Sequence, residues 1–379
     1  MAFISYGRID KKLFLVLAII VLKIIDLIIN KEVPYEYING TLYILEEELG
    51  PIIIGIILLF VFRKQTKEKK ESKEDKKSIK YILILIISRG FKTCYDYFYL
   101  FIVQDEIYSY YCLLNTTNGI EIITITILAY LLLKKKFYGH HKIFMAVYCA
   151  SGITIDIILG NYKIPNYTYI ATYIVYICNE VFLWVYIKYM IDKLYYNYIE
   201  ILIYWGLIGL SFKLFYLSYV LIYEIKNETS LLFEDLYEYF TETNIFVVIF
   251  FQFFYYLSFF GLTYLLLILI IYYLQPNHII INDEFTVFET NMFYVDTNDK
   301  YYTLIPFAFQ VLALLFYFEI LEFNFCKLNK NTAKNIRKRV GNDVGDDDIG
   351  TLIKNDNIDL PGGQYEYELD SLEGDASSL

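Results

Sequence analysis

The chain has 379 residues, of which 57% are hydrophobic and 19% aromatic, and its mean hydropathy is +0.42. Near-unbroken apolar runs of membrane-spanning length recur between residues 12 and 323, which excludes a soluble globular enzyme, a disulfide-stapled secreted domain and a disordered chain. The net charge of −10 arises in residues 341–379, which hold eleven acids and one base, so it indicates nothing about a substrate or nucleic acid.

Ten apolar segments follow one another along the chain and are the expected membrane spans. Only helices and closed barrels satisfy their backbone hydrogen bonds in lipid, and these segments lack the alternation of barrel strands, so we expect an all-α membrane protein. The ninth segment carries Asn282, Asp283, Glu284, Glu289 and Asn291, so a re-entrant or surface segment is the alternative there. The spans are expected at 12–29, 42–62, 81–103, 107–133, 143–159, 167–187, 199–223, 245–274, 279–297 and 302–323.

The distribution of Lys and Arg between the loops predicts the orientation. If the N-terminus is cytosolic, the cytosolic segments hold 24 Lys and Arg and the opposite side holds four. The cytosolic parts are then residues 1–11, a basic loop at 63–80, and a tail at 324–379 that is basic at first and then acidic and disordered. Three N-glycosylation acceptors begin on the opposite side, which fits an endomembrane protein: Asn39, Asn166 and Asn227.

An even count of ten spans with short connections suggests two five-helix halves, at 12–159 and 167–323. An odd number of helices per half gives the second half the opposite topology, which is the inverted-repeat architecture of many secondary transporters. Partner spans in such folds are interrupted by Gly or Pro near the binding site. The second span has Gly50-Pro51 and Gly55, and the seventh, its partner, has Gly206 and Gly209.

Four stretches carry a resemblance to a known family: ILAYLLLKKKFYGHHKIFMAVYCASGITI (127–155), NEVFLWVYIKYMIDKLYYNYIEILIYWGLIG (179–209), QPNHIIINDEFTVF (275–288) and FQVLALLFYFEILEFNFCKLNKNTAKNIRKR (309–339). They resemble the drug/metabolite transporter superfamily, and within it the nucleotide-sugar-transporter-like solute carrier family 35, F subgroup. Asp96 lies close to an Asp that this branch often has in its third helix. The resemblance implies a transporter that moves a small polar metabolite, with an anionic metabolite as one candidate, by alternating access.

Two departures from that family keep a rival interpretation open. The "LRG" of the family's fourth helix has no counterpart, because residues 114–119 read LNTTNG, and the Glu of its "EGLFG" is Trp205 here. Both changes favour a polytopic membrane protein that does not transport: a receptor, an assembly partner or a degenerate transporter relative.

Charged groups inside lipid are costly, so they usually face a partner or a cavity. Lys92 and Asp96 share a face of the third span, and Asn118 and Glu121 share a face of the fourth. A central cavity lined by such residues would bind an anionic solute, whereas the alternative is internal pairing that allows the helices to insert. For Glu121 we expect a cation across the cavity, Lys92 or Lys213. The candidate lining residues are Lys92, Asp96, Asn118, Glu121, Asn179 and Glu180.

Two further charged groups are expected to meet solvent rather than protein. Arg89 is expected to reach the interface with its long side chain. Glu46, Glu47 and Glu48 precede Gly50-Pro51 and are expected to form an exposed acidic edge at the mouth of the second span, with attraction of cations as the alternative.

Nothing in the sequence predicts an enzyme, a cofactor or a metal site. The three histidines, His140, His141 and His278, lack metal-ligand spacing, and there is neither a nucleophile elbow nor a phosphate-binding glycine loop. The five cysteines are expected to be reduced and packed. The expected partners are a small-molecule solute and the lipid bilayer, with no nucleic acid; a homodimer is left open.

Overall fold

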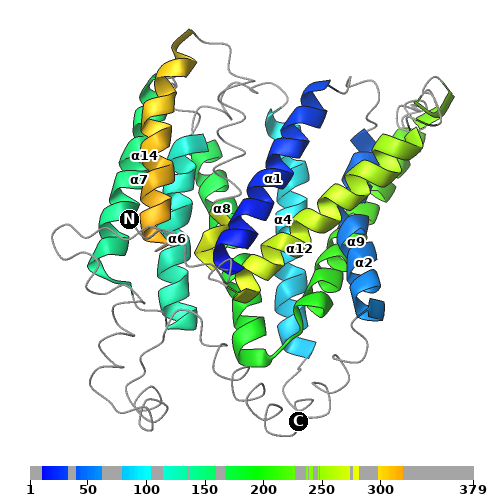
Figure 1. The fold of residues 1–379 in the computed structure, drawn as a ribbon. Coiled ribbons are helices and arrows are strands. Elements are labelled where there is room, and N and C mark those ends of the chain that lie inside the picture. The colour runs from blue at the N-terminus through cyan, green and yellow to red at the C-terminus, as the bar shows by residue number, and fades with distance from the viewer. Residues whose placement is uncertain are drawn as a thin grey trace, which may run out of the picture. The chain divides into compact units, whose positions relative to one another are not determined.

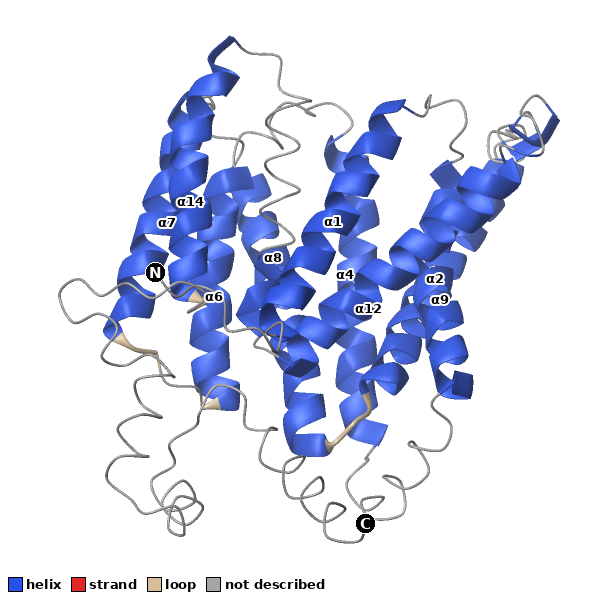
Figure 2. Ribbon diagram, in the orientation of Figure 1, coloured by secondary structure: helices blue, strands red, loops and turns tan. Residues whose placement is uncertain are grey.

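A computed structural model describes residues 11–32, 40–61, 79–103, 114–134, 137–158, 167–226, 236–237, 239–241, 246, 248–273, 276–280 and 298–318. These residues are almost entirely helical and include no β-strand (Figure 2). The all-α prediction is therefore confirmed for this part of the chain. The helices form two compact units, and each unit combines segments from both of the expected five-helix halves.

The larger unit, residues 14–107 and 166–272, contains helices from both halves (Figure 1). The first half contributes most of α1 (Lys11–Glu32), together with α2 (Gly40–Val61) and α4 (Ile79–Val103). The second half contributes α8 (Tyr167–Leu194), α9 (Tyr198–Lys226), the π-helical η3 (Val248–Tyr256) and α12 (Leu257–Tyr273). Within this unit α2 packs along α9 and against η3, and α4 packs on α8 and α9.

Glycines allow α2 to lie close to its neighbours. A Cβ on Gly206 of α9 would lie 2.6 Å from the backbone oxygen of Glu48. A Cβ on Gly50 would lie 2.6 Å from the backbone nitrogen of Gly261, and one on Gly261 would lie 2.7 Å from the oxygen of Gly50. Small residues at crossings of this kind are typical of helices that pack within lipid. The close approach at these glycines places the acidic turn of α2, which holds Glu46, Glu47 and Glu48, directly against α9 and α12.

The smaller unit contains α6 (Leu114–Leu133), α7 (Gly139–Ile158), the 3₁₀ turns η4 (Pro276–Ile279) and η6 (Asn298–Thr303), and α14 (Leu304–Tyr317). The helix α7 packs on α14 and on α6. The rings of Phe144 and Phe316 stack with their centroids 4.9 Å apart. The hydroxyls of Thr126 and Tyr317 hydrogen-bond at 2.8 Å.

Among the described residues, four helical stretches are long and apolar enough to cross a bilayer: Gly139–Ile158, Ile174–Leu194, Tyr198–Lys226 and Phe253–Tyr273. Many large apolar side chains of the described residues are exposed on helix faces, as lipid contact requires. The protein therefore has the composition and helix lengths of an integral membrane protein. The helices α1, α2 and α4 have 22, 22 and 25 residues, so each is at least about 33 Å long at 1.5 Å per residue.

The long described helices fall on segments predicted as spans, with differences at their ends, whereas η4 and the short helical stretches within 236–241 lie outside those segments or at their ends. The helix α8 continues to Leu194, seven residues beyond the predicted end at 187. Charged residues follow the predicted end, and within the helix Lys188 pairs with Asp192 one turn later at 3.1 Å, a contact that supports the helix. Lys188 also donates to the carbonyl of Tyr272 at 3.0 Å, near the end of α12. Almost all of segment 279–297 lies outside the described residues.

Candidate functional site

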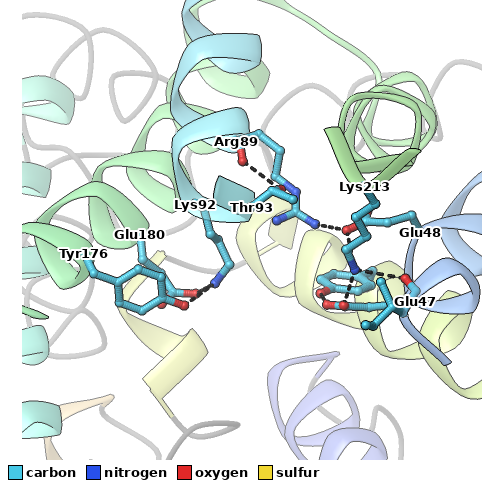
Figure 3. A network of polar contacts seen from close by, with 10 residues as sticks. Glu47, Glu48, Arg89, Lys92, Thr93, Tyr176, Glu180 and Lys213 are labelled. Atoms are coloured by element: carbon cyan, nitrogen blue, oxygen red, sulfur yellow. Dashed lines mark hydrogen bonds and ion pairs between the residues drawn. The ribbon is translucent and has the colours of Figure 1, made fainter. Parts of the chain in front are cut away.

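Two cations three residues apart on α4 reach different neighbouring helices (Figure 3). Arg89 donates from Nη2 to Oε1 of Glu48 on α2. Lys92 donates from Nζ to Oε1 of Glu180 on α8. The helix α4 therefore carries one ionic contact toward α2 and α9 and another toward α8.

The first contact belongs to a cluster built by four helices, which we call the Glu48 cluster: Glu47, Glu48, Arg89, Lys213 and Tyr264. Lys213 of α9 lies 3.1 Å from Glu48 Oε1 and 2.5 Å from Glu47 Oε2. Tyr264 of α12 donates its hydroxyl to Glu47 Oε1 at 2.6 Å. Two carboxylates thus face two cations, and the cluster is neutral overall.

The Glu48 cluster lies in the protein interior, where unpaired charges would be costly. Arg89 is 1% exposed and Glu48 is 0% exposed. A Cβ on Gly209 would overlap the carboxylate of Glu48, so the missing side chain at 209 makes room for that acid. The guanidinium of Arg89 lies 4.4 Å from the centroid of the Trp205 ring, a cation–π contact. Lys213 also donates to the Ile44 carbonyl at 3.0 Å.

The second contact, which we call the Lys92–Glu180 pair, is held by aromatic residues. Lys92 Nζ donates to the hydroxyl of Tyr176 at 3.1 Å and lies 5.2 Å from the centroid of that ring. The Tyr176 ring stacks on Tyr95, with centroids 4.6 Å apart. These contacts set the position of Lys92 on the side of α4 that faces α8.

A reciprocal hydrogen bond between α4 and α8 lies beside this pair. The hydroxyl of Ser88 donates to Asn179 Oδ1 at 2.9 Å, and Asn179 Nδ2 donates to the Ser88 carbonyl at 3.0 Å. Both polar groups of the Asn179 amide are engaged in this contact. Asn179 therefore fixes the register of α8 against α4.

The structure brings together three of the six predicted cavity residues: Lys92, Asn179 and Glu180. Asp96 lies in α4 and Asn118 in α6, but their side chains are outside the described residues. Glu121 lies in α6 of the smaller unit and is partly buried. Roles for Asp96, Asn118 and Glu121 at a solute site stay predictions. The acceptors Asn39, Asn166 and Asn227 also lie outside the described residues.

Two expectations about charged residues were wrong. The acidic turn of α2 is not an exposed edge at two of its three residues, because Glu48 is fully buried and Glu46 is 3% exposed, whereas the Glu47 side chain is 31% exposed. Arg89 does not reach toward the interface, because its guanidinium is buried against Glu48 and Trp205. In both cases a partner on another helix compensates the charge. Burial of the side chain then costs less free energy than its extension to water.

Glu47 and Glu48 were therefore missed as site residues, and Lys213 was considered only as a partner of Glu121. Arg89 and Lys213 are cations within apolar segments, and the second span holds three adjacent acids. That combination is the signal that would have found the cluster. Among the described residues, no group of three or more His, Cys, Asp or Glu side chains is arranged to hold a metal ion.

Comparison with known proteins assigns no family: no family model matches the chain, and no curated protein matches it.

Proposed function

We propose that this chain is a multi-pass transporter that moves a small polar solute across an endomembrane by alternating access. Its ten spans would form two inverted five-helix repeats, with both termini cytosolic. The observation that carries the proposal is the pair of ionic groups on the inward faces of α2, α4, α8 and α9. Ionisable groups within membrane helices most often mark a solute or ion pathway.

Helix packing supports the inverted-repeat part of the proposal. If span n of the first half corresponds to span n + 5 of the second, α2 corresponds to α9 and α7 to α14, and both of these pairs are in contact. The helices α4 and α9, the third and seventh spans, are also in contact. Under the same correspondence, this contact should have a counterpart between the eighth span and α2. The eighth span begins with η3, which packs on α2. The crossing of α2 and α9 contains Gly206, as the repeat interpretation of the glycines requires.

The apolar faces of the helices also support the proposal. On α4, Leu83, Ile87 and Phe91 are exposed and follow one another every fourth residue, whereas Ser88, Arg89 and Thr93 are buried. The cations on α4 therefore lie away from the stripe suited to acyl chains. Such an arrangement is expected of groups that serve a polar solute inside the bundle.

Transport can be tested without a known solute. Purified protein in sealed proteoliposomes is exposed to a defined metabolite mixture, and mass spectrometry identifies what enters. We expect at least one polar metabolite to enter faster than into protein-free vesicles. Entry of no metabolite under any imposed proton or solute gradient would contradict the proposal.

The full charge compensation of the Glu48 cluster favours a second candidate function. Two acids and two bases that neutralise each other also suit a structural lock in a membrane protein that does not transport. The double variant Glu48→Gln/Arg89→Gln distinguishes the two candidates, because it removes one acid and one base together. If the cluster has only a structural role, the protein tolerates this charge-neutral double variant in every assay. A transporter retains its fold but loses solute entry.

A further inference from the structure

The two ionic groups of the larger unit differ in accessibility. The side chains of Arg89 and Glu48 are 2% and 0% exposed, whereas those of Lys92 and Glu180 are 13% and 23% exposed. The Lys92–Glu180 pair is therefore more accessible than the Arg89–Glu48 contact, whereas Glu47, at the edge of the Glu48 cluster, has a side chain that is 31% exposed.

The accessible area of this pair lies beside the buried faces of its helices. Lys92 follows Ser88 by one helical turn, and Ser88 is buried against Asn179. Glu180 precedes Leu183 and Ile187 on α8, both of which are fully buried. The exposed apolar side chains of the preceding turn, Ile174 and Val175, occupy another face. Lys92 and Glu180 therefore project toward protein rather than toward the apolar exposed stripe.

The charge balance of the pair restricts what a ligand can be. An anion that binds Lys92 displaces Glu180 and leaves that carboxylate beside a second negative charge. A cation that binds Glu180 displaces Lys92 and leaves that ammonium beside a second positive charge. A ligand with one carboxylate and one ammonium satisfies both side chains at once, and each charge-assisted hydrogen bond of the original pair is replaced.

We infer that the Lys92–Glu180 pair is the recognition site for a small zwitterion. The ligand carboxylate accepts from Lys92 Nζ, and the ligand ammonium donates to the Glu180 carboxylate. The Tyr176 hydroxyl holds Lys92 Nζ at 3.1 Å, and the Tyr95 ring supports Tyr176, so the cation is held in position before the ligand arrives. The Ser88–Asn179 contact keeps α8 in register with α4. This inference rests on the proposed function and names its substrate class.

Two matched sets of probes test the inference by isothermal titration calorimetry on the detergent-purified full chain. The first set is glycine with methylamine and acetate; the second is leucine with 3-methylbutylamine and 4-methylpentanoate. Within each set the apolar part is closely similar and only the charges change. At least one zwitterion is expected to bind about tenfold tighter than both of its single-charge analogues. Binding of an acid as tight as that of its zwitterion would overturn the inference, as would no binding of either zwitterion.

Variants provide the second measurement. Lys92→Gln is expected to shift the preference toward the amine, and Glu180→Gln toward the acid. The reversed pair Lys92→Glu/Glu180→Lys keeps both charges and is expected to bind the zwitterion within about tenfold of the wild type. Val175→Ala, on the exposed face of α8, is the control and is expected to change nothing. Unchanged preferences in both single-charge variants would contradict the assignment to this pair.

Failure of the inference and failure of transport are separable. If a zwitterion binds but no solute enters proteoliposomes, transport is contradicted and the recognition site stands. If an anionic metabolite enters and no zwitterion binds, transport stands and the substrate class is contradicted.

Discussion

Removing either partner of the buried Arg89–Glu48 contact should destabilise the protein, and removing both should cost much less than the sum of the two single changes. Glu48→Gln leaves Arg89 and Lys213 with Glu47 as the remaining acid of the cluster, and so leaves one buried positive charge in excess. At the observed 3.1 Å between Lys213 Nζ and Glu48 Oε1, the attraction lost is about 5 kcal/mol at an effective dielectric constant of about 20. Measured costs of breaking buried pairs are about 3–5 kcal/mol, which agrees.

The double variant Glu48→Gln/Arg89→Gln leaves Lys213 paired with Glu47 and no excess charge. Its cost should therefore lie well below the sum of the two single costs, by roughly 3 kcal/mol or more. The assay is reversible unfolding in mixed micelles of mild detergent and sodium dodecyl sulfate, followed by tryptophan fluorescence. Additive costs, or single costs under about 1 kcal/mol, would refute a dry, mutually compensated cluster.

Three further predictions concern packing, accessibility and orientation. Gly209→Ala should lower the free energy of unfolding by about 1–3 kcal/mol, because the added Cβ overlaps the Glu48 carboxylate. The control Gly139→Ala, whose Cβ meets nothing within 4 Å, should change it by less than about 1 kcal/mol. Equal effects of the two variants on unfolding would show that the Glu48 carboxylate does not need the space at residue 209. Glu180→Cys in proteoliposomes should react with a membrane-impermeant thiol reagent faster than both Val175→Cys and the wild-type cysteines, and the reverse order would place the Lys92–Glu180 pair against lipid. Expression in microsomes should give glycans that endoglycosidase removes, and each glycan should be lost with one of Asn39→Gln, Asn166→Gln or Asn227→Gln; a chain that carries no glycans would contradict the proposed orientation.

The positions of the helices could be predicted because their signal is local. Each predicted span is a run of about 20 apolar residues, and the long described helices fall on those runs without information from elsewhere in the chain. The exception at the end of α8 has the same local origin, since the Lys188–Asp192 contact spans a single turn. The division into two units that combine both halves was not predicted, because it depends on packing between distant segments.

The site was harder to predict because its partners are far apart in sequence. Lys92 and Glu180 were both recognised as charges within spans, but their pairing across 88 positions has no local signature. Glu48 was misplaced for the opposite reason, since three adjacent acids near a helix end normally indicate a solvated edge. Its burial depends on Gly209 of α9 and on Arg89 of α4, neither of which is near it in the chain.

The two tryptophans of the chain allow a direct test of whether the ionic residues face the protein interior. Trp205 is fully buried beside Arg89, so the single-tryptophan variant Trp184→Phe reports on the Glu48 cluster. In vesicles of brominated lipid, Trp205 should be quenched much less than a tryptophan placed two residues further along α9, at the exposed position of Leu207, in a chain with both native tryptophans replaced by Phe. Equal quenching of the two would place the cluster against the acyl chains and contradict the account.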